Sequence, residues 1–250
     1  MDLGIEGKVA LVMGASRGIG RAIARELAAE GARVAIVSRS LANLDDLAKE
    51  INATPFAHDN GDLDAVPALI AAATSALGPV EILITNTGGP PANPDPLAQS
   101  RELWEAAHRT LLLAPIELIR ATIPAMREGH FGRIVNISST TVREVIPDLI
   151  LSNSERAAAL AAFKTIARDV AGDGITLNTI LTGRIATERI AERHGGSLDA
   201  AETTARSEVP LGRLGSPEEL AAAVAFLSSA RASYITGVAL LVDGGLSRIV

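Results

Sequence analysis

Short runs of β-branched and aliphatic residues alternate with longer amphipathic, alanine-rich segments along almost the whole sequence. The runs predict strands at residues 8–13, 33–38, 81–85, 133–138, 175–180 and 238–242. Apolar residues recur at helical spacing in segments 18–30, 41–51, 62–77, 101–127 and 156–170. Strands that are apolar almost throughout are buried on both faces, and a helix between two such strands produces a right-handed parallel crossover. The pattern therefore predicts a doubly wound parallel sheet with helices on both faces.

The chain has 250 residues, of which 48% are hydrophobic and 21% charged, and this suits one large globular domain. The Gly- and Pro-rich stretch 87–96 is too short to separate two domains. We therefore expect a single α/β domain over residues 1–250, with about seven strands. The segments 101–127 and 156–170 need internal breaks, and Pro115 marks one of them.

Charge and residue counts argue against several functions. Lys and Arg number 23 against 29 Asp and Glu, and a formal net charge of −6 disfavours binding to a nucleic-acid backbone. The chain has no cysteine, and its four histidines are scattered without ligand spacing, so we expect no metal site. The N-terminus lacks the basic start of a signal peptide, and no apolar stretch reaches membrane-spanning length. We expect a cytoplasmic protein with neither nucleic-acid nor membrane partners.

Three glycines, Gly14, Gly18 and Gly20, stand between the first predicted strand and the helix that follows it. Glycines in this context allow a tight turn and a close approach of the backbone to a pyrophosphate, whose charge then lies at the positive end of the helix. A turn that only packs helix against strand is the alternative, but a triplet between a clear strand and a clear helix favours the phosphate site. The loop therefore predicts dinucleotide binding.

The spacing Gly-x-x-x-Gly-x-Gly resembles that of the short-chain dehydrogenase/reductase family, and further motifs extend the resemblance along the chain. They are Asp59, Asn86-Thr87-Gly88, Thr182-Gly183 with Thr187, and segments 212–220 and 235–245. The sequence as a whole is most similar to 3-oxoacyl-(acyl-carrier-protein) reductase-like members. The resemblance implies a Rossmann-type fold, a nicotinamide cofactor and a small carbonyl or alcohol substrate, such as a 3-oxoacyl compound or another small ketone.

The end of the second predicted strand, Ser38-Arg39, bears on the choice of cofactor. A carboxylate there accepts a hydrogen bond from a ribose 2′-hydroxyl, whereas an arginine pairs with a 2′-phosphate. No acid is present, and Arg17 can add a second guanidinium, so NADP(H) is favoured over NAD(H), although a lone Arg39 would suit an ordinary surface position. The cofactor-binding residues that the resemblance implies are Gly14, Ser16, Arg17, Gly18, Ile19, Gly20, Ser38, Arg39, Asp59, Asn60, Asn86, Thr87, Gly88, Arg156, Thr182, Gly183, Ile185 and Thr187.

Family members usually carry an Asn-Ser-Tyr-Lys catalytic set, of which this sequence retains the serine, Ser139. Ser152 stands at the tyrosine position, Arg156 at the lysine position and Thr110 at the asparagine position. An aliphatic hydroxyl is a far weaker acid than a phenol with a pKa of about 10, and a guanidinium stays protonated. We therefore expect a rearranged proton donor: Ser139 and Ser152 order a water that delivers the proton, while Arg156 stabilises the oxyanion or holds the nicotinamide ribose.

Two functions remain open at this point. The first is an NADP(H)-dependent oxidoreductase with a non-standard proton donor, either a water relay or a substrate that carries its own proton donor. The second is a catalytically impaired dinucleotide-binding protein with a sensing or scaffolding role. The preserved phosphate loop and Ser139 favour the first, although a binding protein would also keep them.

The polar segment 184–208, broken at Gly195-Gly196, is typical of a lid over a substrate pocket, and an ordinary solvated helix pair is the alternative. Within it, His194 is the one histidine for which we consider a chemical role, beside the simpler one of a solvated loop residue. The helix at 156–170 and the C-terminal strand resemble the faces through which relatives assemble. We expect a homotetramer or a dimer.

Overall fold

The computed structural model describes residues 1–249, so the expected end of the domain at residue 250 lies outside the described residues. Seven parallel strands form one sheet in the order β3-β2-β1-β4-β5-β6-β7, which confirms the predicted fold class. The strands are β1 (Val9–Val12), β2 (Arg33–Ser38), β3 (Thr54–Ala57), β4 (Ile82–Thr85), β5 (Gly132–Ser139), β6 (Ile175–Thr182) and β7 (Ala239–Val242).

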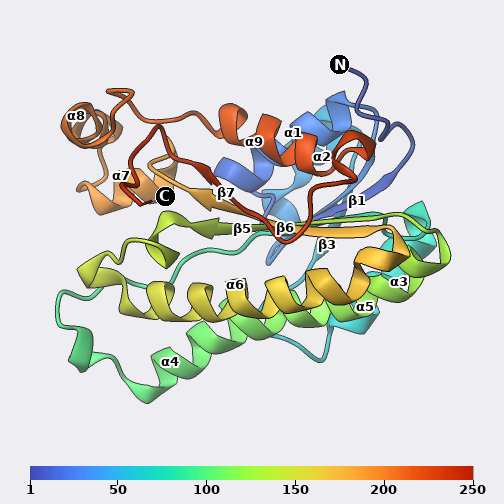
Figure 1. The fold of residues 1–250 in the computed structure, drawn as a ribbon, viewed down its shortest axis with the longest axis horizontal. Coiled ribbons are helices and arrows are strands. Elements are labelled where there is room, and N and C mark those ends of the chain that lie inside the picture. Colours follow the sequence, from blue (N-terminus) through green and yellow to red (C-terminus); the bar gives the residue numbers. More distant parts are fainter. Residues whose placement is uncertain (250) are drawn as a thin grey trace.

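Helices cover both faces of the sheet, with α1, α2 and α9 on one side and α3, α4, α5 and α6 on the other (Figure 1). Their bounds, with those of two further helices, are α1 (Gly18–Ala29), α2 (Asp45–Glu50), α3 (Val66–Leu77), α4 (Arg101–His108), α5 (Ala114–Glu128), α6 (Ile150–Val170), α7 (Glu188–Arg193), α8 (Leu198–Glu208) and α9 (Pro217–Leu227). No helix within residues 1–249 combines the length and the hydrophobicity that a membrane span requires.

Two apolar cores follow from the alternation of side chains along the strands. In β1, Ala10 and Val12 join the cluster beneath α1 and α9, whereas Val9 and Leu11 join the cluster that includes Phe163 of α6. Successive side chains of a strand point to opposite faces, so a strand that is apolar at every position supplies both cores. This burial explains why the strands lack the polar alternation of a half-exposed sheet.

The order of the strands indicates where along the sheet a ligand can bind. Strand β1 pairs with β2 on one side and with β4 on the other, so the direction of winding reverses between β1 and β4. In open α/β sheets, ligands bind outside the carboxyl ends of the strands at such a reversal. The glycine loop after β1 and the Asn86-Thr87-Gly88 segment after β4 both lie there.

The helical segments differ from expectation at two places. The break in segment 101–127 is a π-helical turn, Arg109–Leu113, which ends just before Pro115 at the start of α5. The expected break in 156–170 was wrong, because α6 runs without interruption from Ile150 to Val170. The helix also begins six residues before the predicted start at Arg156, and in these first turns Ser152 and Glu155 are buried and have polar partners.

Candidate active site

A cleft of about 690 Å³ opens at the carboxyl edge of the sheet, a size typical of small-molecule and cofactor sites. Residues at or just after the ends of six strands, β1 to β6, line it together with residues of the 184–208 segment. All the residues expected to bind cofactor or to act in catalysis line it, namely Gly14, Ser16, Arg17, Gly18, Ile19, Gly20, Ser38, Arg39, Asp59, Asn60, Asn86, Thr87, Gly88, Thr110, Ser139, Ser152, Arg156, Thr182, Gly183, Ile185 and Thr187.

The glycine loop leads directly into the N-terminus of α1. Gly14 and Gly18 have positive φ angles of 63° and 53°, which favour glycine. A Cβ on Gly20 would lie 2.2 Å from the Gly14 carbonyl oxygen, so the turn also depends on the missing side chain there. No side chain caps α1, and its first turn carries no acidic residue. The amide groups of that turn therefore remain available to an anion.

Hydrogen bonds at the ends of β4 and β6 tie neighbouring parts of the cleft floor together. The Nδ2 group of Asn86 donates to the carbonyl oxygens of Met13 and Gly14, each at 3.3 Å, and so ties the end of β4 to the glycine loop. The hydroxyl of Thr182 donates to the carbonyl oxygen of Ser138 at 2.8 Å, which joins the ends of β6 and β5. These contacts make the floor of the cleft a single hydrogen-bonded unit.

One end of the cleft is formed by the residues after β2 and β3. Ser38 is buried and donates to the carbonyl oxygen of Ser40 at 2.7 Å, while Arg39 is exposed. Burial lowers the pKa of His58, which favours a neutral imidazole. Arg17, expected to assist Arg39, lies 3.5 Å from a carboxylate oxygen of Glu192 in α7. Its guanidinium is thus shared between this end of the cleft and the helix above it.

The other end combines the last residue of β5 with the first turns of α6. Arg156 donates from Nε to the hydroxyl oxygen of Ser152 at 3.1 Å and from Nη1 to the carbonyl oxygen of Ile137 at 3.0 Å. Ser139 accepts from the backbone N–H of Thr141 at 3.2 Å. Both serine oxygens therefore act as acceptors within the protein and keep their O–H groups for donation. No direct hydrogen bond joins the two serines within residues 1–249.

Thr110 lies in the π-helical turn between α4 and α5 and faces the cleft. Its hydroxyl donates to the carbonyl oxygen of Ala106 at 2.8 Å. The proton of this hydroxyl is thereby used within the helix, so Thr110 presents only its oxygen lone pairs to the cleft.

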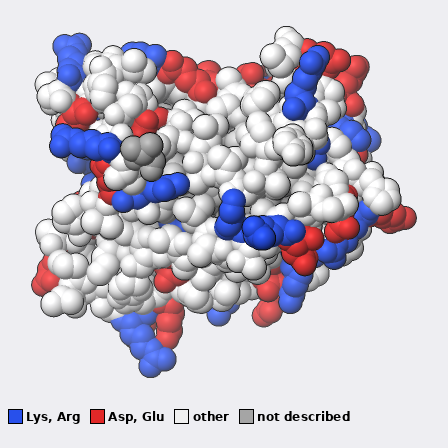
Figure 2. Space-filling view, in the orientation of Figure 1, with Lys and Arg blue, Asp and Glu red and all other residues white. Residues whose placement is uncertain are grey.

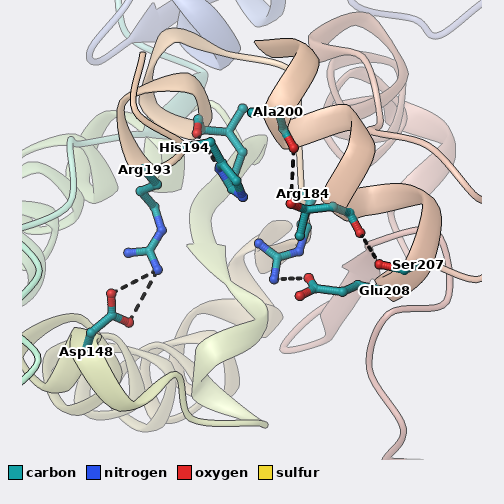
Figure 3. Close-up of polar contacts among 9 residues, drawn as sticks. Asp148, Arg184, Arg193, His194, Ala200, Ser207 and Glu208 are labelled. Atoms are coloured by element: carbon teal, nitrogen blue, oxygen red, sulfur yellow. Dashed lines mark hydrogen bonds and ion pairs between the residues drawn. The ribbon is translucent and has the colours of Figure 1, made fainter. Parts of the chain in front are cut away.

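The 184–208 segment forms α7 and α8, with Gly195-Gly196 between them. Figure 3 shows the two ion pairs that hold it: Arg193 of α7 contacts Asp148 in the turn before α6, and Arg184 pairs with Glu208 of α8. Arg189 also donates from Nη2 to the carbonyl oxygen of Pro90 at 2.7 Å. Helix α7 thereby bridges the walls of the cleft formed by the 87–96 segment and by the turn before α6.

His194 does not enter the site. Its Nδ1 donates to the carbonyl oxygen of Ile190 at 2.8 Å, at the end of α7 (Figure 3), and the residue is absent from the cleft lining. This contact corresponds to the simpler of the two roles considered for it.

Sequence reasoning missed Arg189 and Arg193 as residues of the cleft. A signal was present, because arginines four residues apart lie on one face of a helix. The sequence predicts either a lid or a solvated helix pair in this segment, and nothing local indicates that this face turns toward Pro90 and Asp148. Sequence reasoning also missed the apolar wall of the cleft. Its residues include Leu103, Ala106, Ala107, Ile146, Leu149 and Leu246.

Comparisons with known proteins agree with this arrangement. A family model described as enoyl-(acyl carrier protein) reductase matches residues 14–247. The chain is 35% identical to 3-oxoacyl-(acyl-carrier-protein) reductase FabG of Vibrio cholerae serotype O1 over 249 residues, covering 99% of this chain and 100% of that protein. It is 38% identical to L-rhamnose 1-dehydrogenase (NAD(P)(+)) of Azotobacter vinelandii over 249 residues, or 96% of each chain.

Among solved structures, L-sorbose reductase from Gluconobacter frateurii, complexed with NADPH and L-sorbose, superposes with a TM-score of 0.93 at 31% identity over the full length of both chains. The similarity thus extends to the whole sheet and to both helical layers. The family match and these full-length similarities show that the chain belongs to the short-chain dehydrogenase/reductase family.

Proposed function

We propose that this protein is an NADP(H)-dependent oxidoreductase that interconverts a carbonyl compound and the corresponding alcohol. The observation that carries the proposal is one continuous cleft, with an uncapped helix N-terminus behind a glycine turn at one side and Ser139, Ser152 and Arg156 at the other. The first part suits a dinucleotide and the second suits a polarised carbonyl oxygen. The family relatives named above support this class of reaction.

The residues present fit a nicotinamide dinucleotide. The tight turn in front of α1 requires glycine at Gly14 and Gly20, since a Cβ on either would contact Asn86 or the loop itself. The open amides of α1 suit the pyrophosphate. Asp59 and Thr187 line the same cleft, in agreement with the adenine and nicotinamide sides that the family resemblance implies for them. Gly183, which also lines the cleft, packs closely against the chain after β7. A Cβ on Gly183 would lie 2.5 Å from the Cα of Asp243, so this position too requires glycine.

The cofactor supplies the hydride when it is bound, and the protein must then protonate the alkoxide that forms at the carbonyl oxygen. Ser139 positions the carbonyl oxygen, and the free O–H groups of Ser139 and Ser152 order the water that gives up the proton. Arg156 lies next to Ser152 at 3.1 Å, and its positive charge stabilises the developing oxyanion. This arrangement replaces the usual phenol by a water held between two aliphatic hydroxyls.

The choice of NADP(H) over NAD(H) rests on the end of β2, where Arg39 lines the cleft and no carboxylate follows the strand. Calorimetric titration is expected to show tighter binding of NADPH than of NADH. Arg39→Ala is expected to weaken NADPH binding about tenfold, the scale of one hydrogen bond to a charged group, and to leave NADH binding unchanged. Arg33→Ala is the matched control, since Arg33 is exposed at the opposite end of the same strand.

Equal binding of the two cofactors by the unaltered protein would contradict the NADP(H) preference. Absence of binding by either would contradict the oxidoreductase proposal as a whole.

We further propose that the chain assembles as a homotetramer or a dimer. Strand β7 forms an edge of the sheet, and its Leu240 and Leu241 are each 37% exposed. Helix α6 exposes Ala157, Ala158 and Ala161. Figure 2 shows a broad uncharged area on this face, which Lys or Arg side chains interrupt near its centre. Light scattering is expected to give about four times the chain mass of 25.8 kDa for a tetramer, and a mass near 25.8 kDa would contradict assembly.

A further inference from the structure

Six arginines line the cleft, and they differ in whether the protein supplies a negative partner. Four of them, Arg17, Arg184, Arg189 and Arg193, have a carboxylate within 4 Å. Among residues 1–249, Arg39 and Arg156 have none. Arg39 is exposed beside the proposed adenosine phosphate, which would neutralise it. Arg156 therefore remains as the cation of the cleft that still requires a partner.

Two hydrogen bonds fix the direction of the Arg156 guanidinium. Nε is used by Ser152 and one N–H of Nη1 by the carbonyl oxygen of Ile137. The remaining Nη1 hydrogen and both Nη2 hydrogens make no hydrogen bond with residues 1–249. A guanidinium presents two such N–H groups side by side, in the geometry that binds both oxygens of a carboxylate.

Arg133, which is buried, shows the contrast with the half-buried Arg156. Arg133 donates to the carbonyl oxygens of Ser229, Gly132 and Gly174, and it lies 4.3 Å from the ring centre of Phe131. Its charge is thus enclosed by acceptors and an aromatic face, away from the cleft. Arg156 has two uncharged acceptors only, and it opens into the cleft.

The surroundings of Arg156 disfavour the charged form of its guanidinium. Burial, reinforced by the positive charge of Arg189, lowers the pKa of Arg156 to about 10. The group is still protonated near pH 7, so a poorly solvated cation faces the cleft beside a second cation. An anion arriving between them would relieve both the desolvation and the repulsion.

Apolar residues that line the same cleft limit the rest of the ligand. Ile146 and Leu149 precede α6 and line the cleft, and Asn153 of α6 donates to the carbonyl oxygen of Ile146 at 2.8 Å. Ala107 of α4 also lines the cleft and belongs to the same apolar cluster as Leu151 of α6. A short apolar chain therefore suits the space beside the cation.

We propose that Arg156 binds a carboxylate of the substrate, so that the protein reduces a short oxo acid to the hydroxy acid or catalyses the reverse oxidation. The inference rests on the proposed oxidoreductase function and specifies its substrate class. In the reduction, the carbonyl carbon gains a hydride from NADPH, the carbonyl oxygen gains a proton from water, NADP⁺ is released, and the carboxylate is unchanged. The same charge that holds the carboxylate favours the alkoxide formed nearby.

The test compares acids with their uncharged esters on the NADP⁺-loaded protein, where no reduction can occur. The probes are 2-oxobutanoate, 3-oxobutanoate and 4-oxopentanoate, each beside its methyl ester, titrated by calorimetry. At least one acid is expected to bind about tenfold more tightly than its ester, the scale of one hydrogen bond to a charged group. Arg156→Gln is expected to abolish this preference, and Arg156→Lys is expected to retain part of it, since lysine keeps the charge without the fork.

Arg168→Gln is the matched control, because Arg168 is exposed on the same helix and its loss removes the same charge. It is expected to keep the full preference for the acid. The inference is overturned if every ester binds as well as its acid to the unaltered protein, or if the preference survives in Arg156→Gln. It is also overturned if Arg156→Gln weakens NADP⁺ binding while leaving the acid preference intact, because the charge then serves the cofactor phosphates.

Two further measurements separate this inference from the proposed function. If the unaltered protein fails to bind NADP⁺, the oxidoreductase proposal fails, and the acid and ester titrations on the cofactor-free protein still decide whether Arg156 binds a carboxylate. If Arg156→Gln does not fold, as judged by its thermal unfolding, Arg156→Lys decides the matter. An unchanged acid preference in Arg156→Lys then counts against the bidentate contact.

Discussion

Gly20→Ala is expected to lower the free energy of unfolding by about 3 kcal/mol and to weaken NADPH binding about 100-fold. The added Cβ would lie 2.2 Å from the Gly14 carbonyl oxygen and 2.8 Å from Nδ2 of Asn86. The first neighbour is backbone within the turn itself, so it cannot move away as a flexible side chain could. Relief requires a shift of the loop that positions the open amides of α1.

Thermal or denaturant unfolding and NADPH calorimetry measure the two effects separately. Gly172→Ala is the matched control, since a Cβ on Gly172 meets no atom within 4 Å and the residue has no positive φ. It is expected to change stability by no more than about 0.5 kcal/mol and to leave NADPH binding intact. Normal stability and normal NADPH binding in Gly20→Ala would contradict the assignment of this loop as the phosphate site.

Ser139→Ala and Ser152→Ala are each expected to lower kcat about 100-fold, the lower range for loss of assisted proton transfer. Each oxygen accepts a hydrogen bond inside the protein, from Thr141 N–H and from Arg156 Nε respectively, and each O–H is left to hold the same water. Removal of either hydroxyl therefore releases that water. Loss of NADPH absorbance with a reactive oxo acid or ketone measures kcat.

Ser154→Ala is the control for the serine pair, because Ser154 is exposed on the same turn of α6. Ser152→Thr is expected to be more active than Ser152→Ala. Threonine keeps a hydroxyl at this position, whereas alanine also removes the acceptor of the Arg156 Nε hydrogen bond. If Ser139→Ala abolished turnover while Ser152→Ala left it intact, the paired-serine relay would be wrong. The proton would then come from elsewhere, for example from the substrate.

Periodicity was sufficient for most of the sheet, and its errors have local causes. Residues 33–38 were predicted as a strand and form β2 with the same bounds. Strand β6 continues two residues beyond the predicted end, to Thr182, because β5 and β7 extend the ladder past the apolar run. The residues of the short β3 are only partly buried or exposed, so they form no apolar run from which a strand could be predicted. Asp59, which follows the strand, was the one indication of its position.

Helix α6 shows why tertiary contacts override a local pattern. Its first turns read LSNSER, which is too polar to extend the predicted apolar helix back beyond Arg156. In the fold, Glu155 is buried and lies 3.0 Å from Nδ1 of His108 in α4, and Ser152 accepts from Arg156. These partners satisfy the polar groups that the first turns of α6 bury.

The order of strands and helices along the chain was enough to predict the sheet, the edge at which the cleft lies and the glycine loop that lines it. Those features depend on residues that are neighbours in the chain and on the order in which strands and helices follow one another. The direction of the Arg156 guanidinium, set by the carbonyl of Ile137, and the bridge from Arg189 to Pro90 depended on packing between distant segments. Such contacts form only when the sheet and its helices bring separate parts of the sequence together, so no pattern within one segment contains them.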